Sequence, residues 1–391
     1  MEVNRRDKTG MAEIEEFLKK KAEEGLLRQL RPITSRRNSR VYFGERVYLD
    51  FSSNDYLGLN GHPKLVASAK EALEKFGTSS SASRLLSGDL EIHHSLEEKV
   101  AHFKNKESAL VFNSGYQANI GILSALYNRD DVIFSDRLNH ASIIDGIRLT
   151  GAKLLRFQHN DLNHLEDMLK RERKKYKKAL IVTETIFSMD GDRPHLEGLV
   201  NLKDKYDCQI MVDEAHATGI YGQNGSGVVE EEGLADRIDL IMGTFSKALA
   251  SFGAYVATSK KTVDYLINTC RSFIYSTALP PVVIACNLTS IDLVKEESYR
   301  RYNLLKCAEF FRNSLKSRGF EVRGDSQIIP LIIGDNFKVI DYAHRLQEKG
   351  YWVLPIRPPT VSQGEARLRL SLTFHHNIQQ LQRLIDEISN L

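Results

Sequence analysis

The 391-residue sequence contains little cysteine and no long apolar run. Its four cysteines include no Cys-x-x-Cys pair, so neither a zinc site nor a disulfide framework is expected. No apolar run approaches the roughly 20 residues that a membrane-spanning helix requires. The sequence begins with Met-Glu-Val-Asn-Arg-Arg and continues charged, without the apolar stretch of a signal peptide. These absences predict a soluble cytoplasmic protein that binds no metal and no membrane.

The sequence also lacks an excess of charge of either sign. It has 54 Lys and Arg against 51 Asp and Glu, a formal net charge of +3 at pH 7. This balance does not provide the positive field of a nucleic-acid-binding protein. The one basic cluster, Lys170–Lys178, is interpreted as a solvated helix end. Hydrophobic residues make up 42% of the chain, which is ordinary for a globular protein, and the length allows two or three structural units.

No Gly-Lys dipeptide occurs anywhere, so the phosphate loop Gly-x-x-x-x-Gly-Lys-[Ser/Thr] is missing. This absence matters because Asp213-Glu-Ala-His216 is similar to the magnesium-binding box of nucleic-acid helicases. A nucleic-acid ATPase is therefore disfavoured. Thr244-x-x-Lys247 approaches the Ser-x-x-Lys motif of penicillin-binding enzymes, but their Ser-Asp-Asn motif is absent. The only Lys-Thr-Gly, Lys8–Gly10, lies in a charged segment without a strand pattern.

Two apolar, strand-like segments end abruptly in polar residues: Ile210–His216 and Ile241–Lys247. In open α/β sheets, ligands bind beyond the carboxyl ends of the strands. Pyridoxal phosphate (PLP) requires a lysine for a Schiff base, hydroxyl groups for its phosphate and an acid beside its ring nitrogen. Lys247, Thr244 with Ser246, and Asp213 fit these three roles. A carboxylate at Asp213 would favour the protonated ring nitrogen, which serves as the electron sink.

A second phosphate-binding candidate is the segment Asn113–Asn119, which joins a strand to a helix. The backbone N–H groups of a helix N-terminus bind anions, and Gly115 permits a close approach. A glycine in such a turn also has an ordinary steric explanation. Gly225-Ser-Gly227 lacks the third glycine of a dinucleotide-binding motif and is interpreted as a loop.

Alternating strand and helix patterns predict a largely parallel sheet with helices on both faces. We expect three parts: an arm at residues 1–60, a large α/β domain at 61–285 and a small α+β domain at 286–391. The arm should contain a helix over Met11–Gln29 and two strands within Val41–Phe51. The expected strands of the large domain are Ala109–Phe112, Asp131–Ser135, Lys153–Phe157, Ala179–Glu184, Gln209–Asp213, Asp239–Gly243 and Gly253–Thr258. The last part should contain a long helical segment from Pro281 to about Ser317, strands at Gln327–Ile333, Trp352–Pro355 and Arg367–Leu372, and a helix over Val339–Lys349.

Six motifs together resemble the α-oxoamine synthases, a branch of the fold-type I PLP enzymes, over nearly the whole chain. They are Phe51–Leu59, Ser83–Gly88, Asp136–Ser142, Phe187–Gly191, Val212–Gly219 and Gly243–Leu249. The resemblance implies a seven-stranded, mostly parallel sheet with a smaller C-terminal domain, bound PLP and a homodimer. It also implies an acyltransferase that condenses an amino acid with an acyl thioester and releases carbon dioxide. One departure is Thr78–Ser83, where serines replace a glycine-rich stretch of many relatives.

The resemblance implies roles for individual residues. Lys247 would form the Schiff base and act as general base, Asp213 would pair with the ring nitrogen and His140 would stack on the ring. The ring oxygen and its surroundings would be held by Ser188 and His216. The phosphate would be held by Gly115, Tyr116 and Thr244, together with Ser276 or Thr277 of the partner subunit. Arg369 would receive the amino-acid carboxylate, and substrate would also contact Arg28, Asn54 and Thr360.

Three segments, Ser246–Val256, Arg271–Pro281 and Ile356–Val361, are most similar to the family member that joins L-alanine to a pimeloyl thioester in biotin biosynthesis. Ile143–Arg148 is similar to 2-amino-3-ketobutyrate CoA ligase, and serine palmitoyltransferase-like or acyl-amino-ketone signal synthase activities also remain open. The acyl carrier can be coenzyme A or an acyl carrier protein. From another class, a non-catalytic α/β scaffold that kept the fold is the alternative.

Overall fold

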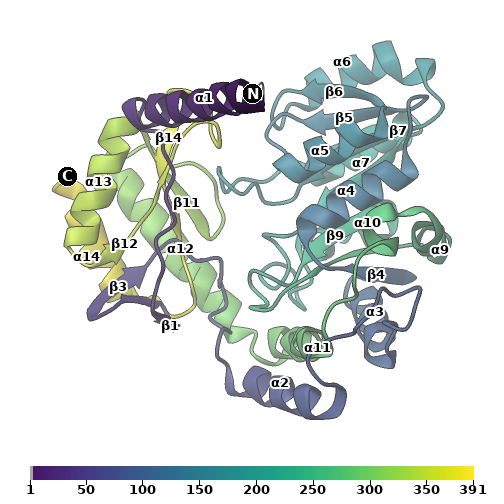
Figure 1. Ribbon diagram of the computed structural model, residues 1–391, viewed down its shortest axis with the longest axis horizontal. Helices are drawn as coiled ribbons and strands as arrows, with labels where there is room; N and C mark the ends of the chain where they lie inside the picture. The colour runs from purple at the N-terminus through teal and green to yellow at the C-terminus, as the bar shows by residue number, and fades with distance from the viewer. Residues whose placement is uncertain (1–2) are drawn as a thin grey trace. The chain divides into compact units, whose positions relative to one another are not determined.

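The computed structural model describes residues 3–391, with side chains from Met11 onward (Figure 1). The chain divides into two compact units. The large unit comprises residues 54–306 and 373–375, and the small unit comprises residues up to 53, 307–372 and 376–391. The three-part division with boundaries near residues 60 and 285 stays a prediction. No helix of the described chain is long and apolar enough to cross a membrane.

The large unit is built on a seven-stranded sheet with the order β4-β10-β9-β8-β7-β5-β6. Only β10 runs antiparallel to its neighbours β4 and β9, while β9, β8, β7, β5 and β6 pair in parallel. The strands are β4 (Ser108–Phe112), β5 (Val132–Asp136), β6 (Lys153–Phe157), β7 (Ala179–Glu184), β8 (Gln209–Asp213), β9 (Leu240–Thr244) and β10 (Ala254–Thr258). All seven strands predicted for the large domain are therefore present.

Helices cover both faces of this sheet (Figure 1). The helices of the large unit are α2 (Pro63–Phe76), α3 (Glu91–Phe103), α4 (Gly115–Leu126), α5 (Ala141–Thr150), α6 (Leu162–Glu172), α7 (Leu196–Lys205), α8 (Val228–Glu231), α9 (Lys260–Thr269), α10 (Arg271–Ile274) and α11 (Pro281–Glu296), with short 3-10 helices η1 (Arg173–Lys175) and η2 (Ala235–Arg237). On one face, residues of α4, α5, α9 and α10 form a buried cluster with alternate strand residues such as Met211 and Met242. Burial on both faces explains why the strands are continuous apolar runs.

The small unit has two smaller sheets. Strands β1 (Ser35–Arg37), β2 (Arg40–Phe43), β3 (Arg46–Asp50) and β12 (Tyr351–Trp352) form the first. The second has the order β11-β14-β13, from β11 (Ile328–Gly334), β13 (Pro355–Ile356) and β14 (Ala366–Ser371). The helices α1 (Val3–Glu23), α13 (Asn336–Glu348) and α14 (Ile378–Ser389) belong to this unit, and α12 (Tyr299–Ser317) contributes to both units.

Two helix predictions and one strand prediction need correction. The strand expected over Trp352–Pro355 is two short strands, β12 and β13, which belong to different sheets. The segment from Pro281 to Ser317 is two helices, α11 and α12, because the chain leaves the helical conformation at Glu297. The helix expected over Met11–Gln29 ends at Glu23, since Gly25 follows with a positive φ of 65°, a conformation that terminates helices. The basic run that begins at Lys170 lies at the end of α6 and in η1, mostly exposed, as expected.

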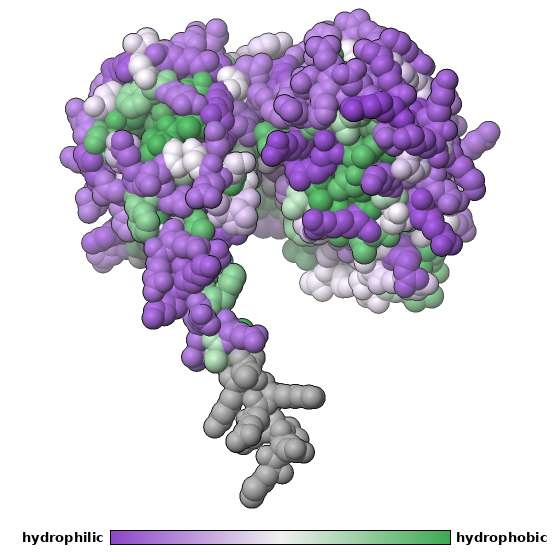
Figure 2. Space-filling model, turned by 90° about the horizontal axis from the view of Figure 1, so that it is seen from above, coloured by the Kyte–Doolittle hydropathy of each residue, from purple (hydrophilic) through white to green (hydrophobic). Residues whose placement is uncertain are grey.

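The surface mixes polar and apolar side chains. On the face shown in Figure 2, hydrophilic residues predominate, with patches of hydrophobic residues among them. Exposed apolar residues of the large unit include Leu85, Leu86, Phe252 and Tyr275. All four cysteines have free thiols.

His159 forms two hydrogen bonds that connect two loops at the carboxyl edge of the large sheet. His159 contacts Asp136 at the end of β5 through Nδ1 (2.9 Å) and Asp192 through Nε2 (2.8 Å). These two carboxylates outweigh the effect of burial and raise the pKa of His159 to about 10. Asp192 in turn accepts, through its backbone carbonyl, the N–H of Phe187. The imidazolium therefore fixes the loop that follows β7.

We expect His159→Gln to lower the free energy of unfolding by about 2 kcal/mol at pH 6, because it leaves two carboxylates without their cation. The histidine binds its proton more tightly in the folded chain, where its pKa is about 10, than in the unfolded chain, where it has its ordinary pKa of 6.5. Its stabilisation is therefore complete below about pH 6.5 and is lost as the pH rises toward 10. Denaturant unfolding of both proteins between pH 6 and pH 10 tests this. A stability difference that stays constant over that range would contradict the expectation.

Candidate active site

Four polar residues end neighbouring strands at the carboxyl edge of the large sheet. They are Asp136 of β5, Glu184 of β7, Asp213 of β8 and Thr244 of β9, and all four are buried. Parallel strands bring their carboxyl ends to the same edge, where open α/β sheets bind ligands. Glu184 and Asp213 are paired neighbours in the sheet, so their side chains share one face.

Asp213 is held by hydrogen bonds to both carboxylate oxygens. Asn119 of α4 donates its Nδ2 to Oδ2 (3.0 Å), and the backbone N–H of Ala215 donates to Oδ1 (2.9 Å). Asn119 also donates to the hydroxyl of Ser142 (2.9 Å). These bonds fix the carboxylate on the α4 side of the sheet, and its expected pairing with a ring nitrogen stays a prediction.

A buried ion pair between Lys104 and Glu214 anchors the loop that follows Asp213. Lys104 contacts Glu214 at 2.7 Å, and neither side chain is more than 1% exposed. The same ammonium donates to the hydroxyl of Thr218 (3.1 Å) and to the carbonyl of Ser226. Glu214 also accepts the N–H of Val229 (2.9 Å). Because these donors and acceptors are paired, the segment that carries Asp213 and His216 has one defined path.

His216 and Asn54 are joined through Tyr56. The hydroxyl of Tyr56 contacts Nδ1 of His216 (2.7 Å) and Oδ1 of Asn54 (3.1 Å). His216 is 6% exposed. The structure thus links a residue expected at the cofactor with one expected at the substrate, through a tyrosine that the sequence analysis did not single out. Tyr56 lies inside the sequence motif Phe51–Leu59, and membership of that motif was the signal that could have identified it.

His140 caps the N-terminus of α5, and its ring remains accessible to solvent. Its Nδ1 contacts the hydroxyl of Ser142 (2.8 Å), and the ring of Tyr116 packs edge-on at 6.3 Å between centroids. The surrounding protein lowers the pKa of His140 by desolvation, Asp213 opposes this effect and Lys247 adds to it. His140 therefore shares one electrostatic environment with Asp213 and Lys247, in addition to serving as a cap.

Glu184 is a site residue that sequence reasoning missed. Its Oε1 accepts the backbone N–H of His140 at 2.7 Å. Burial raises the pKa of Glu184 to about 8, and the neighbouring charge of Asp213 raises it further, while Lys247 and the bond from His140 oppose the shift. Its carboxyl group therefore holds a proton near neutral pH. In the sequence it was only the last residue of a predicted strand.

Thr244 and the start of α4 have the features of a phosphate cradle. The hydroxyl of Thr244 is buried and has no hydrogen-bond partner among the described residues. A Cβ on Gly115 would lie 2.8 Å from Cγ2 of Thr244, so only glycine allows this approach. Ser114 caps the helix by accepting the N–H of Gln117 (3.2 Å), while the first helical N–H groups point outward as at other helix starts. An anionic phosphate fits these donors.

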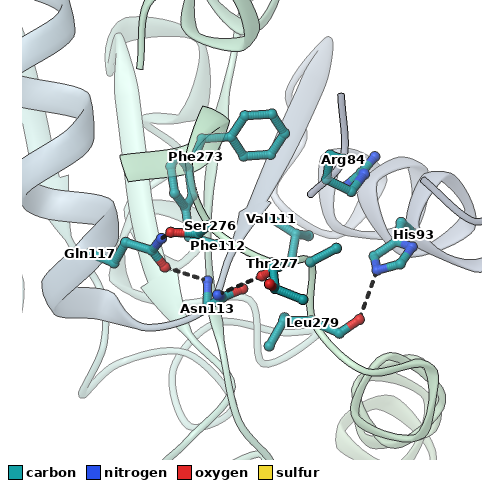
Figure 3. Close-up of a pocket in the computed structure, with 11 residues that line it drawn as sticks. Arg84, His93, Val111, Phe112, Asn113, Gln117, Phe273, Ser276, Thr277 and Leu279 are labelled. Carbon is teal, nitrogen blue, oxygen red and sulfur yellow. Dashed lines mark hydrogen bonds between the residues drawn. The ribbon is translucent and has the colours of Figure 1, made fainter. Parts of the chain in front are cut away.

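Ser276 and Thr277 lie beside the same helix start within the chain. Gln117 donates to the hydroxyl of Ser276 (2.8 Å), and Asn113 donates to the carbonyl of Thr277 (2.9 Å), as Figure 3 shows. These residues line a cavity of about 10 Å³, which is room for about one water molecule. The role expected for Ser276 or Thr277 across a dimer interface stays a prediction.

Lys247 lies in the turn directly after β9, three residues beyond Thr244, and is half-buried. Its positive charge contributes to lowering the pKa of both His140 and Glu184. Ser188 is half-buried in the loop after β7. This is the loop that the hydrogen bond between His159 and Asp192 holds in place. Tyr116, in the first turn of α4, is exposed and donates its hydroxyl to Asp145.

The three other expected substrate residues belong to the small unit. Arg28 donates to the hydroxyl of Thr360 at 2.8 Å, so the structure brings these two residues together although 332 positions separate them. Arg369 lies in β14, is buried and donates to the hydroxyl of Ser371 (2.7 Å). Their contacts with substrate stay predictions.

Comparisons with known proteins agree with this arrangement. Residues 46–388 match the family described as aminotransferase class I and II. The chain is 47% identical over 372 residues to 8-amino-7-oxononanoate synthase of Geobacter sulfurreducens, covering 94% of this chain and 95% of that protein. It is 44% identical over 370 residues to the protein of the same name from Geotalea daltonii, covering 94% of each chain.

Solved structures extend the comparison. Serine palmitoyltransferase from S. paucimobilis with a bound PLP–myriocin aldimine superimposes with a TM-score of 0.91 at 30% identity, covering 98% of this chain and 97% of that one. 8-Amino-7-oxononanoate synthase from Francisella tularensis has a TM-score of 0.77 at 30% identity, covering 88% and 97%. The predicted fold type is confirmed. The chain therefore belongs to the class I and II aminotransferase family.

Proposed function

We propose that this chain catalyses the PLP-dependent condensation of L-alanine with a pimeloyl thioester in biotin biosynthesis. The products are 8-amino-7-oxononanoate, carbon dioxide and the free thiol. The observation that carries this proposal is the 47% identity, over nearly the full length of both chains, to a protein named 8-amino-7-oxononanoate synthase.

The residues of the large unit fit PLP. Lys247 would hold the aldehyde carbon, Asp213 the ring nitrogen, and Thr244 with the N-terminus of α4 the phosphate. His216 and Ser188 would contact the ring oxygen and its surroundings, and His140 would lie against the ring face. When bound, PLP supplies an electron sink for the carbanion formed at the amino-acid Cα.

The chain's own groups would then direct the reaction. Arg369 would bind the alanine carboxylate through its guanidinium, which orients the Cα–H bond. The neutral amine of Lys247 would take the proton from Cα as general base. His140 would donate a hydrogen bond to the thioester carbonyl. Glu184 would position His140, because its carboxyl group accepts a hydrogen bond from the backbone N–H of His140.

The proposal includes a cytoplasmic homodimer with shared active sites, in which Ser276 or Thr277 of one subunit reaches the phosphate bound by the other. Arg28, Asn54 and Thr360 would contact the acyl substrate. Coenzyme A and an acyl carrier protein are both candidate carriers. A serine palmitoyltransferase-like activity is the second candidate, supported by the TM-score of 0.91 to that enzyme.

Purified protein supplied with PLP should release free thiol from pimeloyl-CoA in the presence of L-alanine, and far less with glycine or L-serine. Lys247→Ala should fold normally but lose thiol release, because it lacks both the covalent anchor and the base. Thiol titration and the visible absorption of the bound cofactor measure the two effects. Preference for serine with a long acyl chain would favour the second candidate, and full activity of the variant would refute the role of Lys247.

Thr244→Val should weaken PLP binding about ten-fold through loss of one hydrogen bond to a charged phosphate. It should stabilise cofactor-free protein by about 1 kcal/mol, because it replaces a buried hydroxyl that has no partner among the described residues with a methyl group of similar size. Thr258→Val is the matched control: its buried hydroxyl donates to the carbonyl of Asp239 (2.7 Å), so stability should fall while PLP affinity holds. The opposite pattern in absorbance titrations and unfolding curves would exclude Thr244 as a phosphate ligand.

Glu184→Gln should flatten the pH dependence of stability in cofactor-free protein. The carboxyl pKa is raised from its ordinary 4.5 to about 8 in the folded chain. The folded state therefore binds the proton more tightly, and stability from this group is lost as the pH rises from about 4.5 to 8, at most about 1.4 kcal/mol per pH unit. Denaturant midpoints at pH 5 to 8 measure the two slopes. Identical slopes would show that Glu184 does not hold this proton.

A further inference from the structure

Arginine is concentrated in one short segment of the small unit. Residues 26–46 contain six arginines, one glutamate and no lysine or aspartate. The chain as a whole carries a net charge of only +3, so this segment is far more basic than the rest. The sequence analysis did not identify it as a basic cluster because apolar and hydroxyl residues separate most of the arginines.

Part of this segment forms one wall of a groove within the small unit. The groove has a volume of about 830 Å³, which is in the range of small-molecule sites. Four guanidinium groups line it, those of Arg28, Arg31, Arg36 and Arg357, and its lining contains no aspartate or glutamate. Most other lining residues are apolar, and they come from the arm, α13 and the segment from Trp352 to Ile356.

The positive charge in the groove is largely uncompensated. Arg28 donates to the neutral hydroxyl of Thr360, and Arg357 donates to the carbonyl of Gly25. Arg31 donates to the side-chain amide of Gln347 at 3.1 Å and lies 5.9 Å from the ring of Trp352. Of the four, only Arg36 is paired with a carboxylate of the described chain, that of Asp50 at 3.5 Å.

The arginines also repel one another. Burial lowers the pKa of Arg357, and the positive charge of Arg28 lowers it further. An anion between these guanidinium groups would relieve the repulsion, and planar guanidinium groups bind phosphate bidentately. The apolar walls require that the anion be attached to a chain that can pack on them. A bare inorganic ion would leave these walls uncovered.

We propose that this groove binds the phosphate of the phosphopantetheine arm that carries the acyl group of the substrate. The inference rests on the proposed function, because that function requires an acyl thioester. Coenzyme A and acyl carrier proteins both present this arm, a phosphate followed by methyl, methylene and amide groups. Arg31 and Arg357 contact the phosphate, and the apolar wall covers the pantetheine chain. Arg28, which is bonded to Thr360, also lines the groove.

Calorimetric titration of PLP-loaded protein with 4′-phosphopantetheine and with pantetheine tests the groove directly. The phosphorylated probe should bind at least about ten-fold more tightly, the equivalent of one charge-assisted interaction. Arg31→Gln should remove most of this difference, and Arg31→Lys should restore part of it. Arg37→Gln and Arg46→Gln are matched controls, because they remove the same charge from exposed positions of the same segment outside the groove. These controls should bind both probes as the unsubstituted protein does.

Equal affinities for the two probes would overturn the proposal. So would an equal loss in Arg31→Gln and in the two control variants, which would indicate a diffuse positive field instead of a site. In turnover assays, Arg31→Gln should raise KM for pimeloyl-CoA and for the pimeloyl carrier-protein thioester by similar factors, and leave KM for pimeloyl-pantetheine unchanged. A rise confined to the carrier protein would show that the arginines contact its acidic surface, and would also overturn the proposal.

The outcome is separable from that of the proposed function. Thiol release from pimeloyl-pantetheine in the presence of L-alanine reports the condensation without any phosphate. If that reaction fails while the calorimetric preference holds, the proposed function is wrong and the phosphate site stands. If the reaction proceeds and the preference is absent, the function stands and the groove proposal fails.

Discussion

The arrangement of the site depends on the buried ion pair between Lys104 and Glu214. Removing two charges from water is costly, and such a pair is retained only where its partners are all satisfied. Here the ammonium also reaches Thr218 and the carbonyl of Ser226, and the carboxylate also receives the N–H of Val229. The consequence is positional. The ion pair fixes the backbone around Glu214 and therefore the position of the neighbouring residue Asp213, on which the site is built.

Around this fixed backbone, the acids at neighbouring strand ends have different hydrogen-bond partners. Asp136 is committed to the imidazolium of His159, whose pKa is raised to about 10. Glu184, buried beside Asp213, has its pKa raised to about 8 and remains neutral. Asp213, on the same face of the sheet, accepts hydrogen bonds at both oxygens, from Asn119 of α4 and from the backbone of Ala215. Pairs of acids whose environments differ in this way are a common basis for dividing roles in a site.

The sequence predicted the sheet well because most of its strands are buried, apolar runs, and four neighbouring ones end in polar residues. It also predicted PLP-binding roles for Asp213, Thr244 and Lys247, since PLP chemistry requires these residue types after such strands, and these roles stay predictions. Glu184 was missed because its role depends on a hydrogen bond to the backbone of His140, 44 positions away, which no local pattern encodes. The groove was missed for the same reason: Arg357 joins the arm only through the fold. The break between α11 and α12 follows from backbone geometry at Glu297 that residue spacing did not indicate.

The unpartnered hydroxyl of Thr244 has a consequence beyond catalysis. A buried polar group without a partner has a free-energy cost that the protein bears until a ligand satisfies it. A ligand that binds only the folded chain shifts the folding equilibrium by mass action. The quantity of correctly folded protein should therefore rise and fall with the concentration of free PLP, so that the cofactor would set the abundance of this chain as well as its activity.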